Sequence, residues 1–319
     1  IHAQWRVVKT EMACKMGHFF DGENAAQKSV LFKTMPPSDW APHRPDAALP
    51  APWRHRFLSR LLFRPSRHRM DCAKRALNMP CPWGKVQIWR EAIGSGCNDM
   101  EQKCRPVAVL RFLGARGRAE QGTTDPLNRL PHVPGEVWIV NPPGFGGSLG
   151  PVSLLRHAQA ALLAFDEMVR HCPHARHWVY GHSLGALFAL HVAARREVHG
   201  LILKNALPVF PLLQSRLGRK AARWLIQGMP PGLDALRNAR HSPSPAVFQI
   251  SLQDTLATPS MQQDLVAAYA GPLRTAFIHG GHDIHQYSSK DEIAYCQAIQ
   301  WLHGLNHAAA AGNTAEQIF

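Results

Sequence analysis

The chain has 319 residues, and 45% of them are hydrophobic, which is the share of an ordinary globular protein and argues against a mostly disordered chain. No run approaches about 18 uninterrupted apolar residues, so we expect no membrane-spanning helix. The formal net charge is +14, and residues 1–80 hold fourteen Lys+Arg against six Asp+Glu. Much of the excess charge therefore lies near the N-terminus, and without a nucleic-acid-binding motif we expect no nucleic-acid partner.

The seven cysteines include no CxxC pair. Their spacing suits neither a zinc knuckle nor a thioredoxin-type redox site, so we expect no bound metal. Disulfides persist mainly in oxidising compartments, and an odd number of unpatterned cysteines is typical of reduced thiols. We therefore predict a cytoplasmic protein.

Residues 1–70 are expected to form a basic, proline-rich extension. Six prolines fall between positions 36 and 52, which favours an extended linker. Residues 51–70 contain no acid, and their apolar side chains share one helical face: Phe57, Leu58, Leu61 and Leu62. Two interpretations stay open for this segment: a helix packed against the domain with a solvated basic side, and a helix in weak contact with a membrane surface.

Strands alternate with helices from residue 71 onward. Apolar, β-branched runs predict strands at 86–93, 106–113, 136–140, 177–180, 200–204, 246–251 and 274–279. Helical periodicity predicts helices at 154–171, 184–195 and 290–303. This alternation, with strands apolar on both faces, predicts an α/β fold with a mostly parallel sheet covered by helices on both sides. We assign this domain to residues 71–305 and expect a flexible tail at 306–319.

Only the segment 209–245 separates two of the predicted core strands, which leaves room for a short lid of two or three helices. This segment holds six cations and one acid, Asp234, among many apolar side chains. A basic, apolar cover suits a small-molecule acyl substrate with an anionic head group. The alternative is a solvated basic face on the lid helices.

The motif Gly181-His182-Ser183-Leu184-Gly185 directly follows a predicted strand and opens a predicted helix. A serine on such a strand-to-helix turn holds its hydroxyl clear of the sheet, and the flanking glycines remove side chains that would clash. The helix N-terminus beneath it favours negative charge. Ser183 is therefore the candidate nucleophile, and the alternative is a serine that only caps the helix.

A serine nucleophile needs a histidine base and a third group that orients it, in the chain order Ser, acid, His for this kind of sheet. Asp254 follows the predicted strand 246–251, and His282 follows 274–279, so both belong at the carboxyl edge of the sheet. We predict His282 as the general base and Asp254 as its orienter. The alternatives are His279 or His285 as the base and Asp283, Asp264 or Asp291 as the acid.

The tetrahedral intermediate of acyl transfer needs backbone N–H donors. Leu184, directly after the nucleophile, is expected to supply one of them. The loop 113–117 is expected to supply the other, and the amide of Ala115 is our choice. His182 is expected to be a packing residue beside the turn.

These motifs resemble the alpha/beta hydrolase superfamily over residues 74–305. The resemblance is carried by GHSLGA, by Asp254 ahead of a DxxxP-like turn, by GGHD around His282, and by the stretches NPPGFGGS and GLILKNALP. It implies an alpha/beta-hydrolase fold, acyl transfer to water from an ester, thioester or amide, and no metal or organic cofactor. Many members carry His-Gly at the oxyanion loop, where this chain has Leu113-Gly114.

We predict a serine hydrolase that cleaves a carboxylic ester through an acyl-enzyme. The stretch GHSLGALFAL also resembles the elbow of stand-alone thioesterases, so an acyl thioesterase acting on carrier- or CoA-bound groups is the main alternative. A third interpretation is a non-catalytic binding protein of the same fold. Such proteins generally lose a triad residue, whereas all three are present here.

Overall fold

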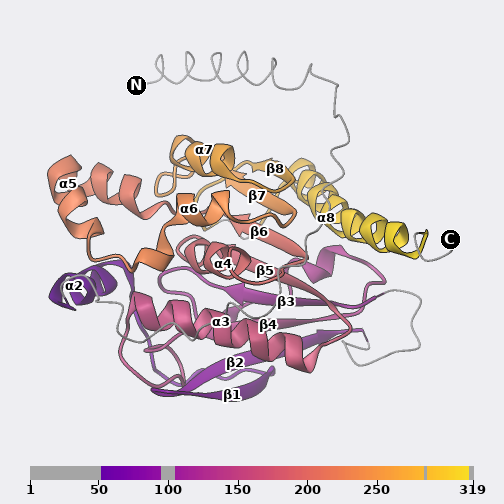
Figure 1. The fold of residues 1–319 in the computed structure, drawn as a ribbon, viewed down its shortest axis with the longest axis horizontal. Helices are drawn as coiled ribbons and strands as arrows, with labels where there is room; N and C mark the ends of the chain where they lie inside the picture. The colour runs from indigo at the N-terminus through magenta and orange to yellow at the C-terminus, as the bar shows by residue number, and fades with distance from the viewer. Residues whose placement is uncertain (1–51, 95–104, 284–285, 316–319) are drawn as a thin grey trace, which may run out of the picture. The chain divides into compact units, whose positions relative to one another are not determined.

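The computed structural model describes residues 52–94, 105–283 and 286–315, with side chains to residue 305, and all of them belong to one compact unit at 48–319. Within these ranges eight strands form one sheet in the order β1-β2-β4-β3-β5-β6-β7-β8 (Figure 1). The strands are β1 Arg75–Cys81, β2 Gly84–Ile93, β3 Val107–Phe112, β4 Gly135–Asn141, β5 Arg176–His182, β6 Gly200–Lys204, β7 Ala246–Ser251 and β8 Leu273–Ile278. The first two pair antiparallel, β2 pairs antiparallel with β4, and the remaining neighbours are parallel.

Helices precede, connect and follow the strands of the sheet. They are α2 Pro52–Leu62, α3 Leu154–His171, α4 Gly185–Ala193, α5 Val209–Ile226, α6 Ala235–Arg240, α7 Pro259–Ala268 and α8 Ser289–Ala315. Short 3-10 turns lie at Ala119–Gln121, Leu127–Arg129 and Pro231–Leu233. No helix in the described part of the chain is both long and apolar enough to cross a membrane.

Alternate residues of the central strands face opposite layers. In β3, Leu110 belongs to the core that includes α3 and α4, whereas Val109 belongs to the core that includes α8. In β5, Val179 and Trp178 divide in the same way. Both faces of the sheet are therefore covered, which confirms the predicted mostly parallel sheet and explains why its strands are apolar on both sides.

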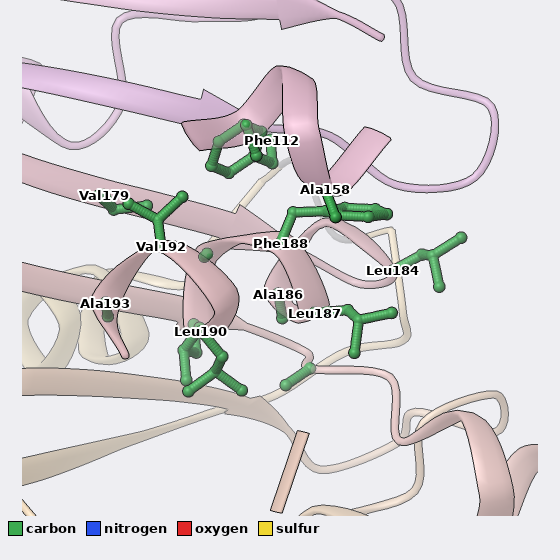
Figure 2. Close-up of a cluster of buried hydrophobic side chains, with 14 of the residues drawn as sticks. Phe112, Ala158, Val179, Leu184, Ala186, Leu187, Phe188, Leu190, Val192 and Ala193 are labelled. Carbon is green, nitrogen blue, oxygen red and sulfur yellow. The ribbon is translucent and has the colours of Figure 1, made fainter. Parts of the chain in front are cut away.

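Helix α4 lies in the middle of the larger core. All nine of its residues are buried, between Ala158 of α3 and strand residues such as Val179 and Phe112 (Figure 2). A helix that is apolar all round must be surrounded by protein. This packing fixes the N-terminal end of α4, which is the end next to Ser183.

Two elements differ from the predicted boundaries. Strand β1 was not expected, because its sequence RALNMPC has no apolar alternation, yet it pairs with β2 through a two-residue turn at 82–83. Helix α8 continues to Ala315, well beyond the predicted end at 303, so the backbone at 306–315 is helical where a tail was predicted. Residues 316–319 lie outside the described residues.

The predicted boundary at residue 70 does not coincide with a break in the packing. Leu58, Leu62 and Phe63 are buried in the same core as α3 and α4. Residues 1–51 lie outside the described residues. The segment 209–245, predicted as a lid, contains α5, the 3-10 turn at Pro231–Leu233 and α6.

The cysteines that the structure describes are free thiols. They are Cys72, Cys81, Cys172 and Cys296. Cys14, Cys97 and Cys104 lie outside the described residues.

Candidate active site

Ser183 sits on a sharp turn between β5 and α4. Its φ is 56°, in the left-handed region that a residue with a side chain rarely adopts. Backbone hydrogen bonds hold it there: its N–H donates to the carbonyl of Lys204 (2.9 Å), and its carbonyl accepts from Leu207 (3.2 Å) and Ala186 (3.1 Å). The neighbouring strand β6 therefore supports the strained conformation, which holds the side chain at the carboxyl edge of the sheet.

The two glycines of the motif are required by close backbone contacts. A Cβ on Gly181 would lie 2.5 Å from the Cα of Ala186, and one on Gly185 would lie 2.1 Å from the carbonyl oxygen of Phe112. Both distances are far inside van der Waals contact. The glycines therefore let α4 pack directly against β5 and β3, as the strand-turn-helix motif predicts.

The structure brings Ser183, His282 and Asp254 together. Nε2 of His282 lies 2.7 Å from Oγ of Ser183, and Nδ1 lies 2.6 Å from Oδ2 of Asp254. The carboxylate of Asp254 is completely buried, while the imidazole of His282 is 12% exposed. Because an ionised carboxylate can only accept, Nδ1 carries the hydrogen and Nε2 is free to accept the proton of the Ser183 hydroxyl.

Asp254 is held by the turn that precedes α7. Its Oδ1 accepts hydrogen bonds from the backbone N–H groups of Leu256 and Ala257, both at 2.8 Å. The other oxygen, Oδ2, therefore faces His282. Two backbone donors compensate for burying this carboxylate and fix its orientation.

Asn205 holds the backbone of the loop after β8 that carries His282, which we call the histidine loop. The sequence did not predict this role. Its Nδ2 donates to the carbonyl of His282 (2.7 Å) and to Oγ of Ser251 (2.9 Å), while its Oδ1 accepts from the N–H of Ser251 (2.8 Å). Asn205 is fully buried with a φ of 45°. The signal in the sequence was a polar residue directly after the apolar strand 200–204, at the same sheet edge as the other site residues.

The alternative triad residues lie elsewhere. His279 and Asp291 pair with each other, with Nδ1 of His279 2.9 Å from Oδ1 of Asp291. The side chain of Asp283 is 74% exposed, and Asp264 is exposed on α7. His285 lies outside the described residues.

His182 packs beside the triad, with its ring centroid 5.5 Å from that of His282 and its Nε2 3.4 Å from the carbonyl oxygen of His282. Burial, reinforced by the nearby charges of Lys204 and His282, lowers the pKa of His182 to about 3, so its imidazole stays neutral. Burial also lowers the pKa of Lys204, whose ammonium donates to the hydroxyl of Tyr287 at 2.8 Å. The packing role expected of His182 stays a prediction.

One group of possible metal ligands lies next to the triad. Among the described residues, His182, His282 and Asp283 offer ligand atoms within 4.8 Å of one another. Both ring nitrogens of His282, however, already face Ser183 and Asp254. A metal ion there would compete with the serine for this imidazole.

The loop 113–117 lies against the nucleophile. A Cβ on Gly114 would lie 3.3 Å from Cβ of Ser183, so the loop backbone passes directly beside the serine. The carbonyl of Ala115 accepts a hydrogen bond from the N–H of Arg64 at 2.9 Å. Leu184 lies at the N-terminal cap of α4. The oxyanion roles predicted for Ala115 and Leu184 remain predictions.

Comparisons with known proteins identify the fold. Neither the protein-family models nor the curated proteins include a match. Among solved structures, DcsB in complex with its substrate analogue is 13% identical, with a TM-score of 0.56 over 74% of this chain and 100% of that one. An esterase from Pyrococcus furiosus is 14% identical, with a TM-score of 0.52 over 70% of this chain and 90% of that one.

An acetyl xylan esterase from Paenibacillus sp. R4 is 15% identical, with a TM-score of 0.51 over 76% of this chain and 92% of that one. At such identities the similarity concerns the fold. Three features of this chain agree with that similarity: the order of the strands, the antiparallel pairing of the first two strands, and the turn that carries Ser183. The chain therefore has the fold of the alpha/beta hydrolase superfamily.

Proposed function

We propose that the chain is a serine hydrolase that cleaves a carboxylic ester through an acyl-enzyme. The observation that carries this proposal is the continuous hydrogen-bonded series from Ser183 through His282 to Asp254, with contacts of 2.7 Å and 2.6 Å. A serine hydroxyl is a weak nucleophile until a histidine accepts its proton and a third group orients that histidine. The esterases among the structurally similar proteins support the same chemistry.

In the first half of the reaction, Oγ of Ser183 attacks the acyl carbon while Nε2 of His282 takes the hydroxyl proton. The buried carboxylate of Asp254 stabilises the imidazolium that forms. The amides of Leu184 and Ala115 donate to the oxyanion of the tetrahedral intermediate. His282 then returns the proton to the departing alcohol, and the acyl group stays on Ser183.

In the second half, a water molecule replaces the alcohol. His282 takes a proton from this water, the hydroxide attacks the acyl carbon, and the proton is returned to Oγ of Ser183 as the acid leaves. All steps are proton transfers and acyl transfer, so the proposed mechanism requires no metal or organic cofactor.

An acyl thioesterase is the second candidate, and the charge of α5 favours it. The helix begins two residues after Leu207, whose N–H bonds the Ser183 carbonyl, and it carries cations with no acid between Val209 and Ile226. Such a helix suits an acyl group attached to an anionic carrier or to CoA. We therefore propose α5 and α6 as a lid that contacts the substrate.

Hydrolysis of p-nitrophenyl esters from acetate to palmitate, with acyl-CoA thioesters alongside, tests both candidates. Ester hydrolysis that falls by several orders of magnitude in Ser183→Ala supports the esterase. Thioester turnover far above ester turnover supports the thioesterase. The matched control is Ser260→Ala, because Ser260 is an exposed serine on α7 outside the triad, and we expect its removal to leave activity unchanged.

A fluorophosphonate probe separates an enzyme from a non-catalytic binding protein of this fold. Covalent labelling of the wild type, absent in Ser183→Ala and retained in Ser260→Ala, supports the proposal. A folded wild type that neither labels nor hydrolyses any ester or thioester contradicts it.

A further inference from the structure

The helix α2 divides its side chains among three faces. His55, Leu58, Ser59 and Leu62 are buried against the domain. A second stripe at positions i, i+4 and i+8 is apolar and exposed, with Trp53 54%, Phe57 51% and Leu61 39% exposed. A third group at the same spacing is basic and exposed, with Arg56 and Arg60 on the helix and Arg64 two residues beyond its end. The first face holds the helix on the core of the domain, while Trp53 and Arg54 contact α5.

The buried face fixes the position of α2. Nε2 of His55 lies 2.9 Å from Oγ of Ser153, and its Nδ1 lies 3.2 Å from the carbonyl of Gly228. The hydroxyl of Ser59 accepts from the N–H of Leu154 at 3.1 Å. The exposed apolar stripe thus belongs to a helix that specific hydrogen bonds hold in one orientation.

Helix α5 extends this surface. Trp224 is 41% exposed and its ring centroid lies 5.2 Å from that of Trp53, so the apolar patches of the two helices meet. The guanidinium of Arg54 lies 4.9 Å from the centroid of the Trp224 ring and donates to Gln227 at 2.6 Å, which joins α2 to α5. The two helices lie together at one end of the sheet, on the left of Figure 1.

The charge on these helices has one sign. The exposed cations of α5 are Arg216, Arg219, Lys220 and Arg223. Neither Pro52–Leu62 nor Val209–Ile226 contains an aspartate or glutamate. Exposed tryptophan, phenylalanine and leucine flanked by arginine and lysine, with no acid, is the composition of a helix that lies in the interface of an anionic membrane.

The exposed apolar and basic side chains of the two helices together form what we call the α2–α5 surface. We propose that this surface docks the protein on an anionic lipid bilayer, with Phe57, Leu61 and Trp224 entering the headgroup region. Each basic side chain near an anionic surface adds attraction that salt screens, and the apolar side chains add an attraction that salt does not screen. An acidic protein partner would need the cations but has no requirement for three exposed aromatic and aliphatic side chains beside them.

The surface is connected to the candidate active site at both helices. Arg64, two residues after the end of α2, donates its N–H to the carbonyl of Ala115 in the loop beside Ser183. Helix α5 starts at Val209, two residues after Leu207, which bonds the Ser183 carbonyl. A bilayer on this surface would therefore contact the two helices that adjoin the segments around the nucleophile.

Vesicle flotation of the full chain tests the inference. We expect the wild type to float with vesicles of phosphatidylcholine containing 30% phosphatidylglycerol (about one anionic lipid in three) and to stay unbound with phosphatidylcholine alone. Two multiple variants are each expected to weaken binding at least about tenfold. The apolar variant combines Phe57→Ser with Leu61→Ser. The charge variant combines Arg56→Gln, Arg60→Gln, Lys220→Gln and Arg223→Gln. All substituted side chains are exposed, so circular dichroism is expected to show unchanged folding.

The charge-matched control removes four exposed cations elsewhere: Arg75, Arg240, Arg274 and Lys290. We expect it to bind like the wild type. Equal loss in this control would show that net charge alone drives binding and would overturn the proposal. Loss in the charge variant without loss in Phe57→Ser with Leu61→Ser would show that the apolar side chains do not enter the bilayer and would also overturn the proposal.

The outcome is independent of the proposed reaction. Ser183→Ala is expected to float like the wild type, because Ser183 is not part of the surface. A wild type that hydrolyses soluble esters but does not float with anionic vesicles contradicts only the docking surface. A wild type that floats but neither hydrolyses nor labels contradicts only the proposed function.

Discussion

A few individual backbone contacts determine the geometry around Ser183. The left-handed conformation of this residue is stabilised from β6, while Gly181 and Gly185 let the following helix approach the sheet without a side chain between. The motif's glycines were interpretable from the sequence because their reason is local. The contact of Asn205 with the histidine loop joins residues 77 positions apart, so it depends on the pairing of β6 with β7 and on the position of the loop after β8.

We expect Gly185→Ala to lower the free energy of unfolding by about 3 kcal/mol, because its Cβ would lie 2.1 Å from the Phe112 carbonyl and α4 would have to move away from β3. Urea denaturation measures this. The control is Gly304→Ala on α8, where a Cβ meets nothing within 4 Å. There the better helix propensity of alanine raises stability by about 0.5–1 kcal/mol. Equal effects of the two substitutions would contradict the steric argument.

Asn205 is expected to act as a positioning residue for His282. Asn205→Ala removes the donor to the His282 carbonyl, and we expect kcat to fall about tenfold or more with KM little changed, since small displacements of a catalytic group are costly. Asn205→Asp keeps the shape but replaces the donor by a carboxylate that repels this carbonyl. Protonation of the introduced carboxyl group restores a donor. The kcat/KM of this variant divided by that of the wild type is therefore expected to rise as pH falls. A ratio that does not vary with pH would indicate a structural role alone.

At the scale of elements, the sequence predicted the parallel strands closely and missed the antiparallel strand β1. Helix α3 has the predicted bounds, and the strands β3 to β8 lie within two residues of their predicted positions, because buried strands and amphipathic helices have strong apolar patterns. Strand β1 pairs with β2 alone and is mostly exposed, and its sequence has no alternation of apolar and polar residues from which a strand could be predicted. In α2, Phe57 and Leu61 share a face by spacing with Leu58 and Leu62, and only packing against α3 decides which pair is buried.

The packing of α3 makes stability depend on pH. His157 lies among Phe63, Phe145 and Phe188, and its Nε2 donates to the carbonyl of Pro143 at 2.8 Å. Burial lowers the pKa of His157 to about 4, from an ordinary value of 6.5. Between these values the unfolded chain binds a proton that the folded chain does not, so stability is lost as pH falls from 6.5 towards 4.

The substitution His157→Gln is expected to remove this loss, because glutamine retains an N–H donor for Pro143 but does not titrate. Between pH 6.5 and pH 5 the wild type is expected to lose about 2 kcal/mol more than the variant. Urea unfolding at both pH values measures the difference. Burial also lowers the pKa values of His55, His177 and His199. These three histidines are present in both proteins, so their contributions to the pH dependence cancel. Parallel pH dependences would contradict the assignment.

For the whole molecule, the question is whether α2 belongs to the cooperative unit or is an appendage. The charge of the N-terminal residues suggested an extension, but Leu58 is completely buried and Arg64 bonds the loop beside Ser183. A leucine at such a site contributes to the free energy of unfolding because its side chain is removed from water and because its deletion would leave a cavity. The surface that α2 presents outward and the core that it fills inward are therefore two properties of one short helix.

We expect Leu58→Ala to lower the free energy of unfolding of the entire domain by about 2–5 kcal/mol, with a single transition. The matched control on the same helix is Leu61→Ala, which removes the same atoms from a side chain that is 39% exposed and is expected to change stability by less than about 0.5 kcal/mol. Far-UV circular dichroism in urea follows the sheet, and hydrogen exchange of the Arg64 amide follows the contact with Ala115. If α2 unfolds with the sheet, Leu58→Ala shifts both measurements equally. Faster exchange of Arg64 with an unchanged main transition would instead show that α2 detaches on its own, and the docking surface would then be joined to the active-site loop only while that helix is packed.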